Sequence, residues 1–310
     1  MDGTILPVPP GLQQILDLER IEDLVFRGRS RPVAETRVFG GEVAGQALIA
    51  AARTVVPERT VHSLHAYFLR PGDPGRPIVY QVDPIRDGRS FTTRRVVGVQ
   101  HGEPIFTLSA SFQVTEPGLH HQMPELSVPG PDELPTAAEL AERGGERSMA
   151  WFAHFSRRFP LDLRFPEQPP GLGAVRGEAR PPRQVVWVRT TETLPDDPAL
   201  HACAATYVSD LMLLATALLP HRLMFGDPRL QMASLDHAVW FHAPFRADDW
   251  LCYQQESPWA GNARALCRGW LFDRAGTLVA TVMQEGLIRV RDGAGHAGAP
   301  GQPSESGGER

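Results

Sequence analysis

Asp210 is the only carboxylate inside a long apolar segment, which makes it the first candidate for chemistry in this sequence. The segment, residues 199–218, follows an Asp197-Pro198 pair typical of a helix N-terminus and predicts a buried helix with Asp210 in its interior. Because burying an ionised carboxylate without partners is costly, neighbouring strands must donate hydrogen bonds to it. Such carboxylates cluster at functional sites, although a hydrogen-bonded structural aspartate fits the same pattern.

Two further polar residues interrupt apolar runs that are typical of strands. Ser234 stands directly before the run 235–241, and Gln284 follows the run 278–283. Neither residue is informative alone, because a serine or glutamine in a strand is usually structural. Together with Asp210, they are the polar residues that the apolar pattern of this part of the chain does not explain.

The spacing of other reactive residues argues against several kinds of chemistry. His237 and His242 are five residues apart on a predicted strand, so they point to opposite faces and do not form a metal-ligand pair. Cys203, Cys252 and Cys267 contain no CxxC pair, which argues against a zinc site or a disulfide framework and fits a reducing compartment. The sequence has no GxSxG, GxGxxG or GxxxxGK[ST] motif. We expect no bound metal and no cofactor.

The elements that must position these residues occur in the same order twice. In each half, a helix that is apolar on nearly every face precedes four strand-like runs, and such a helix must be buried on all sides. The expected helices are 11–24 (short and amphipathic), 41–56 and 199–218. The expected strands are 25–30, 60–70, 76–86, 90–100, 104–114, 184–190, 231–243, 248–257, 262–274 and 277–290. One buried helix followed by antiparallel strands predicts an α+β fold, in which a sheet wraps around the helix.

A repeated motif indicates that this unit is duplicated. Residues 63–71 resemble residues 234–244, and from Tyr67 and Trp240 onward the two copies align without a gap. The distance along the sequence from Tyr67 to Trp240 is therefore the offset between the copies, and we call it the repeat offset. It is far longer than the 20–50 residues of solenoid repeats, so it indicates two copies of a domain.

The polar residues described above stand in the second copy only. The first copy has Gln46 near the place that matches Asp210, and Ala110 or Ser111 at the place that matches Gln284. A duplicated protein with one working site predicts this asymmetry.

The chain is therefore expected to divide into four parts. These are a domain at 11–114, a connector at 115–182, a domain with the candidate site residues at 183–291, and a tail at 292–310. The connector is rich in proline, and its residues 137–143 and 149–159 have the pattern of short helices. The tail is rich in glycine, serine, proline and alanine and is expected to be disordered.

Composition and charge narrow the class of protein. The chain of 310 residues contains 42% hydrophobic and 22% charged residues, as ordinary soluble globular proteins do. Its formal net charge of −5 argues against binding to nucleic acid, which usually requires a basic surface. We find no signal-peptide pattern and no apolar run of membrane-spanning length, so we expect a cytoplasmic protein without membrane insertion.

Six motifs follow one another along the chain and carry a family resemblance. They are VFGGEVAGQAL at 38–48, VHSLHAYFLRPGD at 61–73, RDGRSF at 86–91, SDL at 209–211, LDHAVWFH at 235–242 and QEG at 284–286. With these motifs the sequence resembles the acyl-CoA thioesterase II (TesB-like) family, whose members carry two hotdog domains in one polypeptide. The resemblance covers most of the chain and is weaker in the connector.

The resemblance implies an active site of Asp210, Ser234 and Gln284. The family has an aspartate on the second helix, a hydroxyl residue on the next strand and a glutamine on the last strand. This chain has Ser234 where threonine is usual, and Ala243 where arginine is frequent. By this resemblance Asp210 acts as general base on a water that Ser234 and Gln284 hold, and backbone N–H groups meet the developing oxyanion.

The same resemblance implies a tandem (double) hotdog fold, in which each half is an antiparallel sheet wrapped around a long buried helix. The implied activity is hydrolysis of fatty acyl-CoA to a free fatty acid and coenzyme A, with the acyl chain in an apolar channel between the two hotdog domains. Rim arginines are the expected contacts of the coenzyme A phosphates. The implied assembly is a homo-oligomer, a dimer or tetramer of double hotdogs.

Two alternatives stay open. A double-hotdog enoyl-CoA hydratase or dehydratase shares the fold but is expected to carry a Gly-Asp-x-Asn-Pro-Leu-His type motif, whereas Asp210 is followed by Leu-Met-Leu-Leu. A non-catalytic acyl-CoA-binding protein keeps the channel but not the three polar residues, all of which are present here.

Overall fold

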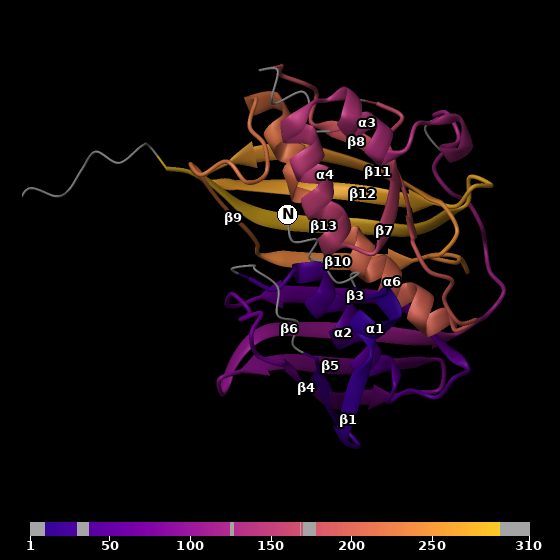
Figure 1. Cartoon of the computed structure of the whole chain (residues 1–310). Coiled ribbons are helices and arrows are strands. Elements are labelled where there is room, and N and C mark those ends of the chain that lie inside the picture. Colours follow the sequence, from indigo (N-terminus) through magenta and orange to yellow (C-terminus); the bar gives the residue numbers. More distant parts are fainter. Residues whose placement is uncertain (1–9, 30–36, 125–126, 168, 170–177, 292–310) are drawn as a thin grey trace, which may run out of the picture.

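The described strands of the computed structural model form one antiparallel sheet that runs through both halves of the chain (Figure 1). The structure describes residues 10–29, 37–124, 127–167, 169 and 178–291. The tail at 292–310, which we expect to be disordered, lies outside the described residues, as do 125–126, 168 and 170–177 of the connector.

The sheet has the same strand order read from either end. The first half contributes, in the order β1-β2-β4-β5-β6-β3, the strands β1 (Leu18–Glu22), β2 (Val25–Gly28), β3 (Arg59–Phe68), β4 (Val79–Asp87), β5 (Phe91–Gln100) and β6 (Glu103–Val114). The second half continues in the order β10-β13-β12-β11-β8-β7, with β7 (Leu161–Arg164), β8 (Arg183–Thr190), β10 (Asp236–Phe241), β11 (Leu251–Gly261), β12 (Arg264–Phe272) and β13 (Leu278–Val290). A further strand, β9 (Leu230–Ser234), pairs with β13.

The two halves meet where β3 pairs with β10. His65 stands opposite Ala238 in this antiparallel pair, and these two residues are separated in the sequence by the repeat offset. Under a two-fold relation, a residue on the axis faces its own counterpart, and its neighbours exchange partners. The pairs on either side meet this condition: Tyr67 stands opposite Asp236, and their counterparts Trp240 and Ser63 stand opposite each other. The register of the sheet therefore carries the same duplication as the sequence.

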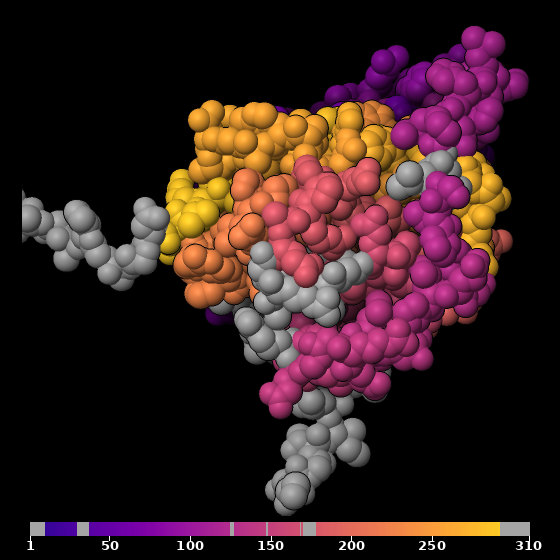
Figure 2. All heavy atoms as spheres, turned by 90° about the horizontal axis from the view of Figure 1, so that it is seen from above, coloured from indigo at the N-terminus to yellow at the C-terminus, as the bar shows by residue number. Residues whose placement is uncertain are grey.

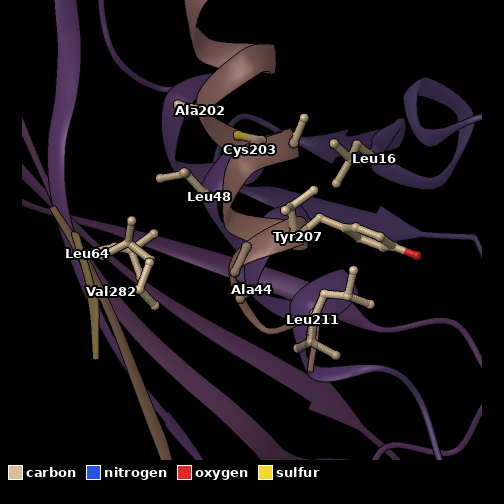
Figure 3. Close-up of a cluster of buried hydrophobic side chains, with 14 of the residues drawn as sticks. Leu16, Ala44, Leu48, Leu64, Ala202, Cys203, Tyr207, Leu211 and Val282 are labelled. Atoms are coloured by element: carbon tan, nitrogen blue, oxygen red, sulfur yellow. The ribbon is translucent and has the colours of Figure 1, made fainter. Parts of the chain in front are cut away.

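Each half has one buried helix on the inner face of the sheet. These are α2 (Gly40–Ala52) and α6 (Pro198–Ser209), and they pack against each other. The contact is close because a Cβ at Gly41 would lie 2.3 Å from the carbonyl oxygen of Tyr207, and one at Gly45 would lie 3.1 Å from that of Cys203. Figure 3 shows Ala44 and Leu48 of α2 beside Cys203 and Tyr207 of α6, with Leu64 and Val282 of the sheet next to them.

The connector adds two helices and one edge strand to the second half. Besides β7, it contains η1 (Pro131–Glu133), α3 (Ala137–Arg143) and α4 (Glu146–Arg158). Figure 2 shows this segment in magenta on the surface over the second half. Phe159, directly after α4, packs on Phe39 at a ring-centroid distance of 5.1 Å, and Phe39 contacts Tyr207 at the same distance. The connector thus reaches the junction of α2 and α6.

Both edge strands differ from the sequence-based expectation. The predicted helix at 11–24 is confined to α1 (Leu12–Leu16), and the chain then forms β1 and turns back into β2. No strand was expected between 114 and 184, and this was also wrong, because β7 pairs with β8. Each of these strands is only four or five residues long, so its alternation is too short to stand out from a helical or irregular pattern.

The expectation that no apolar run reaches membrane-spanning length was wrong as well. Pro198–His221, which comprises α6 and the 3-10 helix η2 (Leu214–His221), has a mean hydropathy of 1.6 and is long and apolar enough by composition to span a membrane. In the structure 83% of the 18-residue apolar window of this segment is buried inside the protein, as expected for a helix enclosed by a sheet.

Candidate active site

Helix α6 ends at Asp210, which corrects the prediction of one helix over 199–218 with Asp210 inside it. Asp210 is the C-cap residue, with φ −81° and ψ −9°, and the next turn begins only at η2. Between them Met212 has a φ of 59°, a left-handed conformation that no α-helix continues through. The side chain of Asp210 is therefore presented at the end of a helix, beside a bend of the chain.

A bulge places Ser234 and Gln284 at the same point. The expected strand 231–243 is divided into β9 and β10, because the pairing with β13 shifts by one residue between Ser234 opposite Gly286 and Ala238 opposite Met283. Bulges redirect side chains and are frequent beside active sites. Here the shift falls beside Gln284, on β13.

The structure brings all three predicted site residues together. The Gln284 Nε2 donates to the Asp210 Oδ1 at 2.5 Å and to the Ser234 Oγ at 3.0 Å. The Ser234 hydroxyl lies 3.4 Å from the same Asp210 oxygen, a longer contact. Gln284 is fully buried, whereas Asp210 and Ser234 are half-buried.

A fourth partner comes from the other half of the chain. The backbone N–H of Gly41, in the first turn of α2, donates to the Asp210 Oδ2 at 2.9 Å. A Cβ at Gly40 would lie 2.7 Å from that oxygen, so the approach needs glycine. These glycines were not among the predicted site residues, although a Gly-Gly pair at the start of an apolar helix was an available signal.

Asp210 has the electrostatic environment of a base that works near neutral pH. Burial raises its pKa to about 6, against the lowering effect of the hydrogen bonds from Gln284, Gly41 and Ser234. The carboxylate lies at the C-terminal end of α6, whose dipole disfavours negative charge, and at the N-terminal end of α2, whose dipole favours it. A pKa near the working pH is what an efficient general base requires.

Three other titratable groups near this end of α6, Tyr253, Cys267 and His237, are neutral near pH 6. Burial raises the pKa of the Tyr253 hydroxyl well above its usual value and that of the Cys267 thiol to about 11. Burial lowers the pKa of His237 to about 4, and its Nε2 lies 2.7 Å from the Ser209 hydroxyl. Among these groups, Asp210 alone changes charge near pH 6.

The first half has no equivalent carboxylate at the end of its helix. The C-cap residue of α2 is Arg53, whereas that of α6 is Asp210. The expected counterpart Gln46 lies in the middle of α2, where its Nε2 donates to the Ile15 carbonyl oxygen at 2.6 Å. Tyr80, which precedes Tyr253 by the repeat offset, donates to the Gln46 Oε1, as Tyr253 donates to the carbonyl oxygen of Ser209 beside Asp210, so Gln46 stays the first-half residue near the matching place.

Strand pairing identifies the counterparts of the other two site residues. Val61 precedes Ser234 by the repeat offset. Val61 pairs with Phe112 of β6, as Ser234 pairs with Gly286 of β13. Gln284 pairs with Cys267 of β12, and Ala110 pairs with Arg94 of β5, which precedes Cys267 by the repeat offset. The strand pairing therefore gives Ala110, and not Ser111, as the counterpart of Gln284. Both counterparts are small or apolar, so this constellation occurs once among the described residues.

Two further features concern possible ligands. Within the described part of the chain, no three His, Cys, Asp or Glu side chains are grouped as metal ligands. A pocket beside the first turn of α2 is lined by Phe39, Glu42 and four arginines: Arg29, Arg37, Arg76 and Arg158. Guanidinium groups gathered in this way favour anionic ligands such as phosphates.

Comparison with known proteins gives the family. The sequence model described as Acyl-CoA thioesterase N-terminal domain matches residues 28–113, and the model described as Acyl-CoA thioesterase matches residues 155–287. Human acyl-coenzyme A thioesterase 8 is 41% identical over 298 residues, which cover 91% of this chain and 92% of the human protein.

Solved structures agree with the fold. The acyl-CoA thioesterase II TesB2 of Mycobacterium marinum has a TM-score of 0.73 and 45% identity, covering 91% of this chain and all of that one. A hot dog fold protein of Alicyclobacillus acidocaldarius has a TM-score of 0.70 at 18% identity, covering 90% and 98% of the two chains. The predicted α+β tandem hotdog fold is thereby confirmed, and this chain belongs to the acyl-CoA thioesterase family.

Proposed function

We propose that this chain hydrolyses fatty acyl-CoA to a fatty acid and coenzyme A, with Asp210 as general base and Ser234 and Gln284 as the residues that hold the attacking water. The observation that carries the proposal is the Asp210 carboxylate itself, half-buried, hydrogen-bonded to Gln284 and Gly41, and with a pKa of about 6. Membership of the acyl-CoA thioesterase family supports the same activity.

The residues supply what thioester hydrolysis requires. Asp210 takes a proton from water as the water oxygen bonds to the thioester carbonyl carbon. The carbon–sulfur bond then breaks, and the leaving sulfur takes the proton from Asp210, so that coenzyme A departs as the thiol and the carboxylate is regenerated. Ser234 and Gln284 contact each other and the same Asp210 oxygen, so both can orient one water molecule beside it. The N-terminus of α2 favours the negative charge that develops on the substrate carbonyl.

A cytoplasmic location and a homo-oligomeric state are further parts of the proposal. All three cysteines are buried, which fits a reducing compartment because no disulfide is needed for stability. Fractionation of the producing cells tests the location, and light scattering on the eluting protein tests the assembly. A monomeric mass or an exported protein would contradict these parts alone.

Release of free thiol tests the activity. Purified protein is mixed with saturated acyl-CoAs of graded chain length, and a thiol reagent follows coenzyme A release; we expect turnover with a preferred chain length. An enoyl-CoA hydratase would instead change the absorbance of an enoyl-CoA without releasing thiol. A non-catalytic binder would retain acyl-CoA in equilibrium dialysis and release no thiol. Either outcome would overturn the proposal.

A further inference from the structure

The end of α6 at Asp210 is held by side chains from distant strands. An α-helix leaves its last carbonyl groups without partners in the helix, and many helices meet this need with a glycine after the cap. This chain has Leu211 and Met212 after Asp210, with Met212 in a left-handed conformation that a non-glycine residue rarely adopts. Something other than local sequence must therefore stabilise the bend.

Three buried side chains stabilise the bend by donating hydrogen bonds to the carbonyl groups on both sides of Asp210. The Tyr253 hydroxyl donates to the Ser209 carbonyl oxygen at 2.6 Å, and the Gln255 Nε2 donates to that of Leu211 at 2.9 Å. The Gln184 Nε2 donates to the carbonyl oxygen of Met212 at 3.1 Å.

The three side chains also hold one another. Tyr253 and Gln255 lie two residues apart on β11 and so face the same side of the sheet, and Gln184 stands opposite Gln255 on β8. The Gln184 Nε2 lies 2.5 Å from the Gln255 Oε1 and 2.8 Å from the Thr216 hydroxyl. Connected buried polar groups of this kind fix one geometry, because each lost bond leaves a buried partner unsatisfied.

The first half lacks these amides, as it lacks the catalytic carboxylate. Val82 precedes Gln255 by the repeat offset on the corresponding strand, and Leu24 stands opposite Val82 as Gln184 stands opposite Gln255. An apolar pair is thus sufficient for the fold of the duplicated unit. The amides occur in the half where the helix must stop at Asp210.

We propose that Tyr253, Gln255 and Gln184 are positioning residues, which fix the end of α6 so that the Asp210 carboxylate points at Gln284 and at the Gly41 N–H. None of the three is bonded to the carboxylate itself; they act through the backbone on either side of it. The inference rests on the proposed role of Asp210 as general base.

Two single substitutions test it. Tyr253→Phe removes one hydroxyl and keeps the ring, and Gln255→Met keeps the length of the side chain without its amide. We expect each to lower kcat by about 10–100-fold with KM changed by less than about twofold, because a base displaced by a fraction of an ångström attacks poorly while the substrate still binds. The acid limb of the pH profile should move to lower pH, because a loosened carboxylate gains water.

The chain offers a matched control. Tyr80 precedes Tyr253 by the repeat offset, is fully buried, and donates its hydroxyl to the Gln46 Oε1 at 2.8 Å, away from Asp210. Tyr80→Phe therefore removes the same buried hydroxyl from the other half, and kcat should stay within about twofold of the wild type. Circular dichroism and thermal melting of all variants separate loss of fold from loss of position.

Combination with Asp210→Asn decides whether the effect passes through Asp210. On that background, Tyr253→Phe and Gln255→Met should lower the residual kcat no further. Equal fractional losses with and without Asp210 would overturn the inference, and so would kcat values and acid limbs matching those of Tyr80→Phe. If Asp210→Asn alone kept full activity, the proposed mechanism would fail, which is a separate result.

Discussion

At the scale of residues, the site depends on an unfavourable environment for one carboxylate. Burial raises the pKa of Asp210, and three hydrogen bonds keep the raised value near 6 instead of higher. The residue types were enough to single out Asp210, Ser234 and Gln284, since each interrupts an apolar pattern. The partner Gly41 does not stand out by its chemistry, because it contributes a backbone N–H that every residue except proline has; its one signal in the sequence is the Gly-Gly pair at the start of α2.

Ser234 and Gln284 should act on the same water. Ser234→Ala and Gln284→Ala are each expected to lower kcat by about 10–100-fold, and the double variant should lose less than the product of the two losses, because both side chains position one molecule. Ser234→Thr should keep most of the activity, since it preserves the hydroxyl and its β-branch restricts the rotamer. Steady-state thiol release measures all four; fully multiplicative losses would argue against a shared water.

The rate should depend on pH through Asp210. Protonation removes the base, so kcat/KM is expected to fall about tenfold per pH unit below about pH 6, in line with the raised pKa. The measurement is kcat/KM from pH 4.5 to 8 in buffers of constant ionic strength. A profile flat down to pH 5 would exclude a base with this pKa.

The same shift predicts a stability effect of Asp210→Asn. A folded-state pKa above the ordinary 3.8 means that folded protein binds the proton more tightly than unfolded protein does, so ionisation lowers stability as pH rises from about 4 to about 6. The variant lacks this loss. The difference between the free energy of unfolding of the variant and that of the wild type should rise by up to about 3 kcal/mol from pH 4 to pH 7. Denaturant titrations at both pH values check this, and a constant difference would contradict it.

At the scale of elements, the geometry of the candidate site depends on where helix α6 ends, and this end is harder to predict than the presence of the helix. The long strands, helix α2 and the start of α6 could be predicted within a few residues, because their apolar periodicity extends over many positions. The stop of α6 at Asp210 could not, since the groups that bond the carbonyls on either side of it are Tyr253, Gln255 and Gln184, on strands far away in the sequence. Tertiary contacts override local pattern at such a point.

The close contact of α2 with α6 should be sensitive to a single methyl group. In Gly41→Ala the new Cβ would lie 2.3 Å from the backbone oxygen of Tyr207, which cannot move without the helix. We expect α2 to shift, with a loss of about 1–3 kcal/mol of stability and a kcat lowered at least tenfold as the Gly41 N–H leaves Asp210.

Gly130→Ala is the control for this change. A Cβ there has only one ordinary contact, 3.5 Å from the Glu133 carboxylate, and the backbone φ of −65° suits alanine. Melting temperatures and thiol release are compared for both variants. If Gly41→Ala matched Gly130→Ala in both, the packing argument would be wrong.

At the scale of the whole molecule, one site needs both halves. Asp210 lies in the second half, whereas Gly41 lies in the first, and the sheet continues from β3 to β10 between them. The repeat offset in the sequence predicted the duplication, and the pairing of His65 with Ala238 has the same offset. Which segments complete each domain stays our proposal, with 115–182 as the connector.

Cutting the connector should therefore leave an active complex. A protease site inserted after Gly118 places the cut next to Leu119, which is fully exposed. We expect the two fragments to elute together and to retain activity, because the β3–β10 pairing and the α2–α6 contact do not depend on chain continuity there. After separation in denaturant, neither fragment alone should release thiol. Dissociation of the cut protein under native conditions would contradict the account.

The most direct test of the central claim is the kcat of Asp210→Asn, measured by thiol release from the best acyl-CoA substrate at pH 8. The substitution keeps the shape of the side chain and removes its basicity, so kcat should fall by about 10²–10⁴-fold while circular dichroism shows an unchanged fold. A folded Asp210→Asn protein with nearly full kcat would show that the carboxylate is structural and that water is activated elsewhere.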